Sequence, residues 1–297
     1  MHSLKANLEL HLLDGTYELF RSFYGSPKRT FQGKEVGATI TFLRSLLRFF
    51  RLSKVTHVAC AFDRTIHSFR NELFKDYKTG EGVDPQIKQQ FLLAEKAARA
   101  AGIVVWPMIH FEADDALASA AKKWENNPRI ARILICTPDK DLAQCINENV
   151  VCFDRRNGQI LDLEGVMKKF GVAPESIPDL LGLVGDVPDG IPGVRGWGRK
   201  SSSVILSHYI HLENIPRKAS DWKVSVRGFE RLNKNLRDSW ENALLYRRLA
   251  TLRRDVPLAE ELDDLKWKGV CREKFLDLCK ELGISGLEKS VPRWDDS

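Results

Sequence analysis

The sequence lacks the features that mark a membrane protein or a zinc protein. It contains no apolar run near the roughly 20 residues that a bilayer-spanning helix needs, so a transmembrane segment is not expected. Residues 1–7 contain no apolar core of a secretory signal peptide. The six cysteines occur singly, and no Cys or His pair has the spacing of zinc ligands. These absences favour a cytoplasmic protein with buried, reduced thiols.

The length and the charge distribution narrow the class further. A chain of 297 residues can form one large α/β domain, or one domain with a smaller helical extension. Residues 186–256 hold 14 Lys/Arg against 8 Asp/Glu, whereas the rest of the chain is balanced at 32 against 32. A basic segment beside an acidic cluster suits an enzyme that holds a polyanion. By charge alone, a solvated helical surface explains the segment equally well.

Apolar runs and helical periodicity alternate through about residue 170. The alternation predicts a mostly parallel sheet with helices on both faces, an α/β fold. Past residue 175 the strand signal stops, and the pattern is helical with a Gly/Pro-rich interruption at 185–198. Asn157-Gly158 indicates a hairpin turn. Strands are expected at 8–13, 55–62, 103–106, 130–136 and 150–153, and helices at 39–52, 86–101 and 112–124.

Three of the predicted strands are followed by acids. Asp14 follows Leu-Glu-Leu-His-Leu-Leu, and Asp63 follows His-Val-Ala-Cys-Ala-Phe. Asp139 and Asp141 follow Ile-Leu-Ile-Cys-Thr-Pro. Ligands bind outside the carboxyl ends of parallel strands, so we expect these acids to converge at one edge of the sheet.

Three further acids, Glu112, Asp114 and Asp115, stand at the start of a predicted helix. Taken singly, each acid of the cluster is explained by a helix cap or a surface charge, but three are more than one cap needs. So many acids in one crevice cannot stay ionised without cations. No histidine joins them, so Mg²⁺ or Mn²⁺ is favoured over zinc. Two such ions can activate a water and neutralise a scissile phosphate, which predicts phosphodiester cleavage.

A second motif is rich in glycine and proline. Its small residues predict a tight turn between two helices, where backbone N–H groups can approach a phosphate. Arg199, Lys200 and Ser201 would contact a nucleic-acid backbone without reading bases. A purely structural inter-helix turn is the alternative. The motif reads Gly185-Asp186-Val-Pro-Asp189-Gly-Ile-Pro-Gly193-Val-Arg-Gly196-Trp-Gly198-Arg199-Lys200-Ser201.

Seven segments occur in an order that carries a resemblance. They are Leu-Leu-Asp14-Gly, Ala-Phe-Asp63, Ser68-Phe-Arg70, Tyr77-Lys78, Glu112-Ala-Asp114-Asp115, Thr137-Pro-Asp139-Lys-Asp141-Leu and Gly185-Asp186-x-x-Asp189-x-Ile-Pro-Gly-Val-x-Gly. Over residues 8–256 the chain resembles the 5′-nuclease family. That family includes the 5′→3′ exonuclease domain of bacterial DNA polymerase I, phage 5′ nucleases and the flap endonucleases.

The resemblance implies a domain organisation. Residues 1–177 would form a PIN-like, metal-dependent nuclease domain, and residues 178–256 a helix-three-turn-helix DNA-binding module. Residues 257–297 would be a small C-terminal helical tail. Because no polymerase domain follows, we expect a stand-alone nuclease that acts as a monomer.

The resemblance also implies roles for particular residues. Arg70 and Lys78 would steer the scissile phosphate at the base of a helical arch formed by 64–85, and Tyr77 could pack or stack there. The turn at 190–201, with Gly193, Gly196, Gly198, Arg199, Lys200 and Ser201, would grip duplex DNA and could bind K⁺ through its carbonyls. A first metal site would use Asp14, Asp63, Glu112, Asp114 and Asp115, and a second would use Asp139, Asp141, Asp186 and Asp189.

The chain departs from the family pattern at the arch. Many relatives have an arginine three residues after the position of Lys78, whereas this chain has Glu81, which weakens the expected phosphate contact there. The expected function is a structure-specific 5′→3′ DNA exonuclease or 5′-flap endonuclease that uses two Mg²⁺ ions, or Mn²⁺ in their place. Its substrate would be DNA with a free 5′ end. A PIN-type ribonuclease, a non-catalytic DNA-junction binder and, more weakly, a metal-dependent phosphatase are the alternatives.

Overall fold

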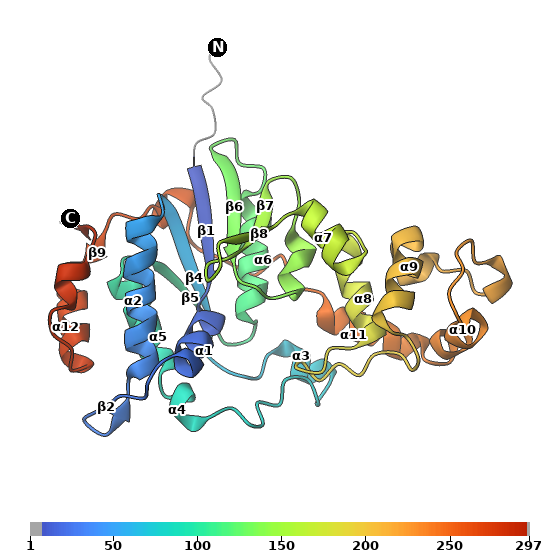
Figure 1. Cartoon of the computed structure of the whole chain (residues 1–297), viewed down its shortest axis with the longest axis horizontal. Coiled ribbons are helices and arrows are strands. Elements are labelled where there is room, and N and C mark those ends of the chain that lie inside the picture. The colour runs from blue at the N-terminus through green and yellow to red at the C-terminus, as the bar shows by residue number, and fades with distance from the viewer. Residues whose placement is uncertain (1–7, 296–297) are drawn as a thin grey trace, which may run out of the picture. The chain divides into compact units, whose positions relative to one another are not determined.

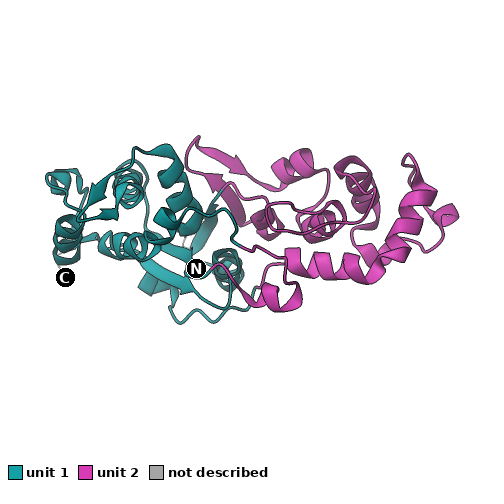
Figure 2. Cartoon of the chain, turned by 90° about the horizontal axis from the view of Figure 1, so that it is seen from below, with its two compact units in different colours: residues 1–65, 80–137, 254–297 teal, residues 66–79, 138–253 magenta. Residues whose placement is uncertain are grey.

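The computed structural model describes residues 8–295 and divides into two compact units (Figure 2). Unit 1 comprises the chain up to Thr65, Gly80–Thr137 and the chain from Arg254 onward, and unit 2 comprises Ile66–Thr79 and Pro138–Arg253. These boundaries differ from the expected ones at 177 and 256. The expectation about residues 1–7 lies outside the described part. Within that part, no helix is long and apolar enough to cross a membrane.

Unit 1 is built on four strands that pair in parallel in the order β5-β4-β1-β6 (Figure 1). Residues 58–62, Val-Ala-Cys-Ala-Phe, are apolar and buried without interruption. Such unbroken apolar runs are typical of parallel strands that are covered on both faces. The parallel sheet predicted from the sequence is therefore confirmed. The strands are β1 (Leu8–Asp14), β4 (His57–Asp63), β5 (Val104–Met108) and β6 (Ile130–Cys136).

Helices cover this sheet. The helix α6 contacts all four strands, while α1 and α5 contact β4 and pack with α2. The chain crosses through α6 from the edge strand β5 back to β6, opposite to the direction of the earlier crossovers, so right-handed connections place α6 on the opposite face from α1, α2 and α5. The helices of unit 1 are α1 (Gly15–Gly25), α2 (Gly37–Leu52), α4 (Pro85–Lys88), α5 (Phe91–Ala100), α6 (Ala113–Trp124) and α12 (Arg272–Glu281).

Three local details differ from the sequence expectations. The helix α1 has no counterpart among the predicted helices. The helix expected at 86–101 is broken between α4 and α5, where the buried amide of Gln90 accepts hydrogen bonds from Thr39 N and Oγ1 at 2.9 and 3.1 Å. The strand β5 continues through Pro107 to Met108, which is tolerated because β5 is the edge strand.

The C-terminal segment belongs to unit 1 and is only partly helical. Besides α12 it forms a short parallel pair, β9 (Val270–Cys271) with β10 (Trp294–Asp295). Trp267 stacks on Phe50 of α2 with ring centroids 4.1 Å apart, and its indole N–H donates to Ala101 O at 2.9 Å. These contacts fix the segment to the core of unit 1. Another short pair, β2 (Thr30–Phe31) with β3 (Lys34–Glu35), precedes α2.

Unit 2 is mainly helical. Its two strands, β7 (Val150–Asp154) and β8 (Gln159–Leu161), pair antiparallel around Asn157-Gly158, which confirms the predicted hairpin. The helix α8 contacts both α9 and α11, and the Gly/Pro-rich segment joins α8 to α9. The helices are α3 (Phe69–Leu73), α7 (Leu163–Phe170), α8 (Ile177–Val184), α9 (Arg199–Tyr209), α10 (Phe229–Asp238) and α11 (Trp240–Ala250), and Asp141–Cys145 forms the 3₁₀ helix η1.

We predict that Trp267→Ala lowers the free energy of unfolding by about 3–5 kcal/mol, because it removes a buried ring and leaves a cavity. Trp267→Phe keeps the stacking and loses only the indole hydrogen bond, so it should cost about 1 kcal/mol. The half-exposed Leu276 of α12 gives the control, since Leu276→Ala should change stability by no more than about 0.5 kcal/mol. Urea unfolding followed by circular dichroism measures all three, and equal losses for the two tryptophan variants would contradict the stacking role.

Candidate metal centres

The first acidic cluster lies in unit 1 at the carboxyl ends of two neighbouring strands. Asp14 is the last residue of β1, and it pairs in register with Ala61, two residues before Asp63 at the end of β4. Asp14 is buried, with 5% of its surface exposed. The parallel register therefore brings Asp14 and Asp63 to one edge of the sheet, as the sequence predicted.

Hydrogen bonds orient these two carboxylates. Asp14 caps α1 by accepting from Tyr17 N at 2.8 Å, and its second oxygen accepts from Thr137 Oγ1 at 2.9 Å. Asp63 accepts from Ala113 N at 2.7 Å. Because Ala113 is the first residue of α6, this bond also holds the N-terminus of α6, with its acids, against the end of β4.

The acids of α6 divide into two kinds. Asp115 is fully buried and accepts from Glu112 N at 3.0 Å, so it serves as half of a capping box. Glu112 is buried at the N-cap position, and Asp114 is half-buried in the first turn. The capping explanation therefore holds for Asp115. Metal binding by these five acids of unit 1 stays a prediction.

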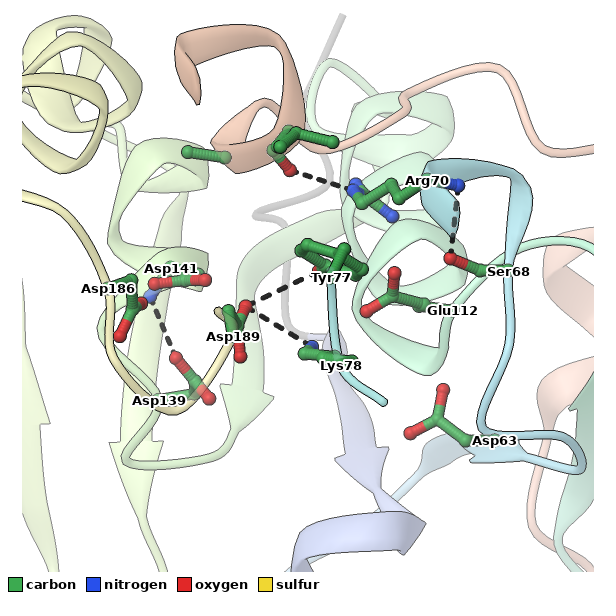
Figure 3. A network of polar contacts seen from close by, with 12 residues as sticks. Asp63, Ser68, Arg70, Tyr77, Lys78, Glu112, Asp139, Asp141, Asp186 and Asp189 are labelled. Atoms are coloured by element: carbon green, nitrogen blue, oxygen red, sulfur yellow. Dashed lines mark hydrogen bonds and ion pairs between the residues drawn. The ribbon is translucent and has the colours of Figure 1, made fainter. Parts of the chain in front are cut away.

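The second acidic cluster lies in unit 2 and is more tightly gathered (Figure 3). Asp141, Asp186 and Asp189 each offer a carboxylate oxygen, and these atoms lie within 4.8 Å of one another. Asp141 and Asp186 are buried, whereas the side chain of Asp189 is 14% exposed. Among residues 8–295, this is the group of three acids whose spacing fits a bound metal ion.

A tight turn builds this cluster. Asp186 and Ile191 exchange backbone hydrogen bonds of 2.8 and 2.9 Å, which closes the turn that carries Asp186 and Asp189 on one loop. Gly190 adopts a φ of +73°, and a Cβ at this position would lie 2.3 Å from the carbonyl oxygen of Asp76. Only glycine fits there, since the backbone of the 66–79 segment passes so close.

Asp139, the fourth predicted ligand of this site, lies apart from the group of three. It is exposed, and its Oδ1 accepts from Asp141 N at 2.9 Å at the start of η1. It adds negative charge beside Asp141, but whether it contacts a metal stays a prediction.

The electrostatics of the second cluster are unfavourable without a cation. The pKa of Asp141 is raised to about 8, first by burial and then by the negative charges of Asp139 and Asp189. Its Oδ1 is buried without a hydrogen-bond partner. Burial by itself would lower the pKa of Lys140. The negative charges of Asp141, Asp186 and Asp139 outweigh burial and raise this pKa, because they stabilise the ammonium form. A buried carboxylate donor set of this kind fits a hard divalent cation.

Lys78, predicted to steer the phosphate, and Tyr77, predicted to pack or stack beside it, both contact Asp189. Lys78 Nζ lies 3.3 Å from Asp189 Oδ2, and the Tyr77 hydroxyl donates to the same oxygen at 3.3 Å (Figure 3). Tyr77 is 2% exposed, so in this structure it packs rather than stacks on a ligand. Lys78 also adopts a φ of +37°, and its N–H donates to Asp189 O at 3.2 Å.

Arg70 is the most deeply buried of the predicted phosphate-binding residues. It is 1% exposed, and its guanidinium donates to Leu249 O at 2.8 Å and Thr251 O at 3.1 Å. It therefore ties α3 to the end of α11 (Figure 3). Contact between Arg70 and a phosphate stays a prediction.

The Gly/Pro-rich turn between α8 and α9 is rigidly held. Gly193 has a φ of +73°, and a Cβ there would lie 2.5 Å from Gly185 N. Trp197 is buried, and its indole N–H donates to Leu232 O at 3.0 Å. Gly196, at φ +83°, provides a second left-handed position.

The start of α9 presents the predicted DNA contacts. Gly198 is the N-cap, and its N–H donates to Ser201 Oγ at 3.3 Å. Arg199 lies over the ring of Phe170 and donates to a backbone carbonyl of α7, whereas Lys200 is exposed. The exposed positions at this helix start suit backbone contacts.

Two residues of these centres were not singled out from the sequence. Thr137 orients Asp14, and Lys140 forms an ion pair inside the second cluster. Both stand within the Thr-Pro-Asp-Lys-Asp motif, Thr137 two residues before Asp139 and Lys140 between Asp139 and Asp141, and this position was the available signal.

Comparisons with known proteins identify the family of the chain. Residues 9–171 match the family described as "5′-3′ exonuclease, N-terminal resolvase-like domain", and residues 172–273 match "5′-3′ exonuclease, C-terminal SAM fold". The 5′-3′ exonuclease of Aquifex aeolicus is 34% identical over 287 residues, which cover 96% of this chain and 95% of that protein. DNA polymerase I of Bacillus caldotenax is 34% identical over 289 residues, but the chain spans only 32% of it.

Solved structures share the fold at lower identity. T5 5′-exonuclease with bound divalent metal ions (zinc) superimposes with a TM-score of 0.64 at 19% identity, over 95% of this chain and 99% of that chain. The catalytic core of Rad2 in complex with DNA substrate gives a TM-score of 0.59 at 16% identity, over 96% and 90%. The resemblance seen in the sequence motifs is confirmed: the chain belongs to the 5′-3′ exonuclease family of metal-dependent nucleases.

Proposed function

We propose that the chain is a structure-specific 5′→3′ DNA exonuclease and 5′-flap endonuclease that leaves 5′-phosphate and 3′-hydroxyl ends and acts in replication or repair. The observation that carries the proposal is the buried group of Asp141, Asp186 and Asp189. Neutral residues would serve a purely structural purpose better than these three acids, because buried unpaired charges destabilise the folded state. Family membership supports the same reaction class.

Each group of residues has a proposed task. Asp141, Asp186 and Asp189, with Asp139 beside them, would hold one divalent cation. The five acids of unit 1 would hold a second. When bound, two Mg²⁺ or Mn²⁺ ions would activate the attacking water and neutralise the scissile phosphate. Lys78 would leave Asp189 to contact that phosphate, with Arg70 holding the 66–79 segment in place.

The proposed substrate is DNA with a free 5′ end. The turn at 190–201 and the start of α9 would grip one duplex through its backbone, so that the shape of the junction rather than the base sequence selects the substrate. K⁺ at the carbonyls of this turn, a monomeric state and a cytoplasmic location belong to the same proposal. The 5′-3′ exonucleases of Aquifex aeolicus and Buchnera aphidicola, of which this chain covers 95% and 98%, support the nuclease part of the proposal.

The direct test is digestion of labelled blunt duplex, gapped duplex, 5′-flap DNA and single-stranded RNA with Mg²⁺ or Mn²⁺. We expect cleavage of DNA with free 5′ ends, 5′-phosphate products and complete loss of cutting in EDTA with binding retained. Preferential cutting of the RNA would favour the PIN-type ribonuclease, and binding without cutting would favour the junction binder.

We predict that Asp186→Asn reduces cleavage by at least about 100-fold while largely sparing DNA binding, because it removes a charged ligand from the buried cluster. Asp139→Asn should act in the same direction. The exposed Asp221 of unit 2 provides the control, and Asp221→Asn should cut at the wild-type rate. Single-turnover cleavage and fluorescence anisotropy on one flap substrate separate the two effects. Wild-type rates in Asp186→Asn would refute the second metal site.

We predict that Lys200→Ala weakens binding about equally for unrelated DNA sequences, because a phosphate contact carries no base readout. The slope of log affinity against log salt should fall by about one unit. Lys122→Ala, which removes an exposed lysine of α6 in unit 1, should leave both quantities unchanged. A sequence-dependent loss of affinity in Lys200→Ala would argue against a backbone contact.

A further inference from the structure

Lys140 occupies a position in the second acidic cluster that none of the proposed steps uses. It stands between Asp139 and Asp141 in the sequence, and its Nζ lies 2.5 Å from Asp186 Oδ2 and 3.6 Å from Asp141 Oδ1. Its ammonium group therefore touches two of the three acids that offer closely spaced oxygens. The ammonium group therefore lies in the region to which the same carboxylates would attract a metal ion.

A positive charge stabilises the carboxylates of this cluster. The side chain of Asp186 is 3% exposed, and Asp141 Oδ1 is buried without a hydrogen-bond partner. Two carboxylates at this spacing repel each other strongly where water is scarce. Asp189 has its own partners, Lys78 and Tyr77, on the opposite flank. Lys140 is thus the cation that serves Asp186 and Asp141.

We propose that Lys140 is an internal counterion that neutralises the second cluster in the absence of metal, and that a divalent cation must displace it in order to bind. This inference rests on the proposed second metal site. It identifies Lys140 as a residue that sets the affinity of that site for cations, rather than as a metal ligand or a catalytic residue.

The side chain is suited to such an exchange. It is 39% exposed, so a path to solvent is open beside the ion pair. The flexible four-carbon stem of lysine lets the ammonium group swing away without moving η1 or the 186–191 turn. The bound ammonium competes with the incoming cation, so the site should fill at a higher cation concentration than the three acids alone would require.

The experiment is a titration of the full-length chain with Mn²⁺ in the absence of DNA, in which the electron paramagnetic resonance signal reports free Mn²⁺. Lys140→Met removes the charge and keeps an apolar stem of similar length. Lys140→Arg keeps the charge, and Lys122→Met is a matched control on an exposed lysine of unit 1. Asp141→Asn identifies which class of bound Mn²⁺ belongs to the second cluster.

We expect the Mn²⁺ class that Asp141→Asn abolishes to bind about five- to tenfold more tightly in Lys140→Met, the scale of losing one partly exposed ion pair. Lys140→Arg and Lys122→Met should match the wild type. Thermal unfolding gives an independent readout: Lys140→Met should unfold at a lower temperature than the wild type in EDTA, and added Mn²⁺ should raise its midpoint by more.

Two results overturn the inference, and they are distinguishable. If Asp141→Asn loses a class of Mn²⁺ and Lys140→Met binds that class no more tightly than the wild type, then Lys140 does not compete with the cation although the second site stands. If Asp141→Asn binds Mn²⁺ as the wild type does, the second site of the proposed function fails and the role of Lys140 fails with it.

Discussion

Electrostatic repulsion among buried carboxylates is the physical constraint that shapes the second acidic cluster, in unit 2. Asp141, Asp186 and Asp189 lie close together where little water reaches, and burial with neighbouring charges raises the pKa of Asp141 to about 8. Two lysines offset part of this negative charge, Lys140 beside Asp186 and Lys78 beside Asp189. A divalent cation would do the same with a higher charge and more ligands.

One continuous loop links the proposed metal ligands of unit 2 to the part of the chain proposed to hold DNA. Asp186 and Asp189 stand on a turn that continues, through Gly193 and Trp197, into α9. Close backbone approaches at Gly190 and Gly193 leave this loop little freedom, because neither position has room for a Cβ. The acids proposed as ligands and the turn proposed to grip duplex DNA therefore belong to one closely held segment, so a shift of one is expected to move the other.

In unit 1, side chains that are predicted to bind metal also have structural roles. Asp14 caps α1, Asp63 holds the start of α6, and Asp115 closes a capping box. Each bond fixes a carboxylate in one orientation, so capping prepares an acid for metal binding rather than excluding it. For these residues the sequence left capping and metal binding as alternatives; the hydrogen bonds establish the structural roles, and metal binding stays a prediction.

The sequence by itself determined the parallel sheet and the family. Apolar runs typical of strands covered on both faces, and acidic motifs in a fixed order, are local signals. It predicted the strands that carry Asp14 and Asp63, and the turn that carries Asp186 and Asp189. It did not show the break at Gln90, since that break depends on a hydrogen bond to Thr39, about fifty residues away. Only the tertiary structure buried Arg70 and Tyr77, left Asp139 exposed outside the close group of three acids and placed Lys140 on Asp186. Burial and ion pairing depend on segments distant in sequence, whose approach no local pattern records.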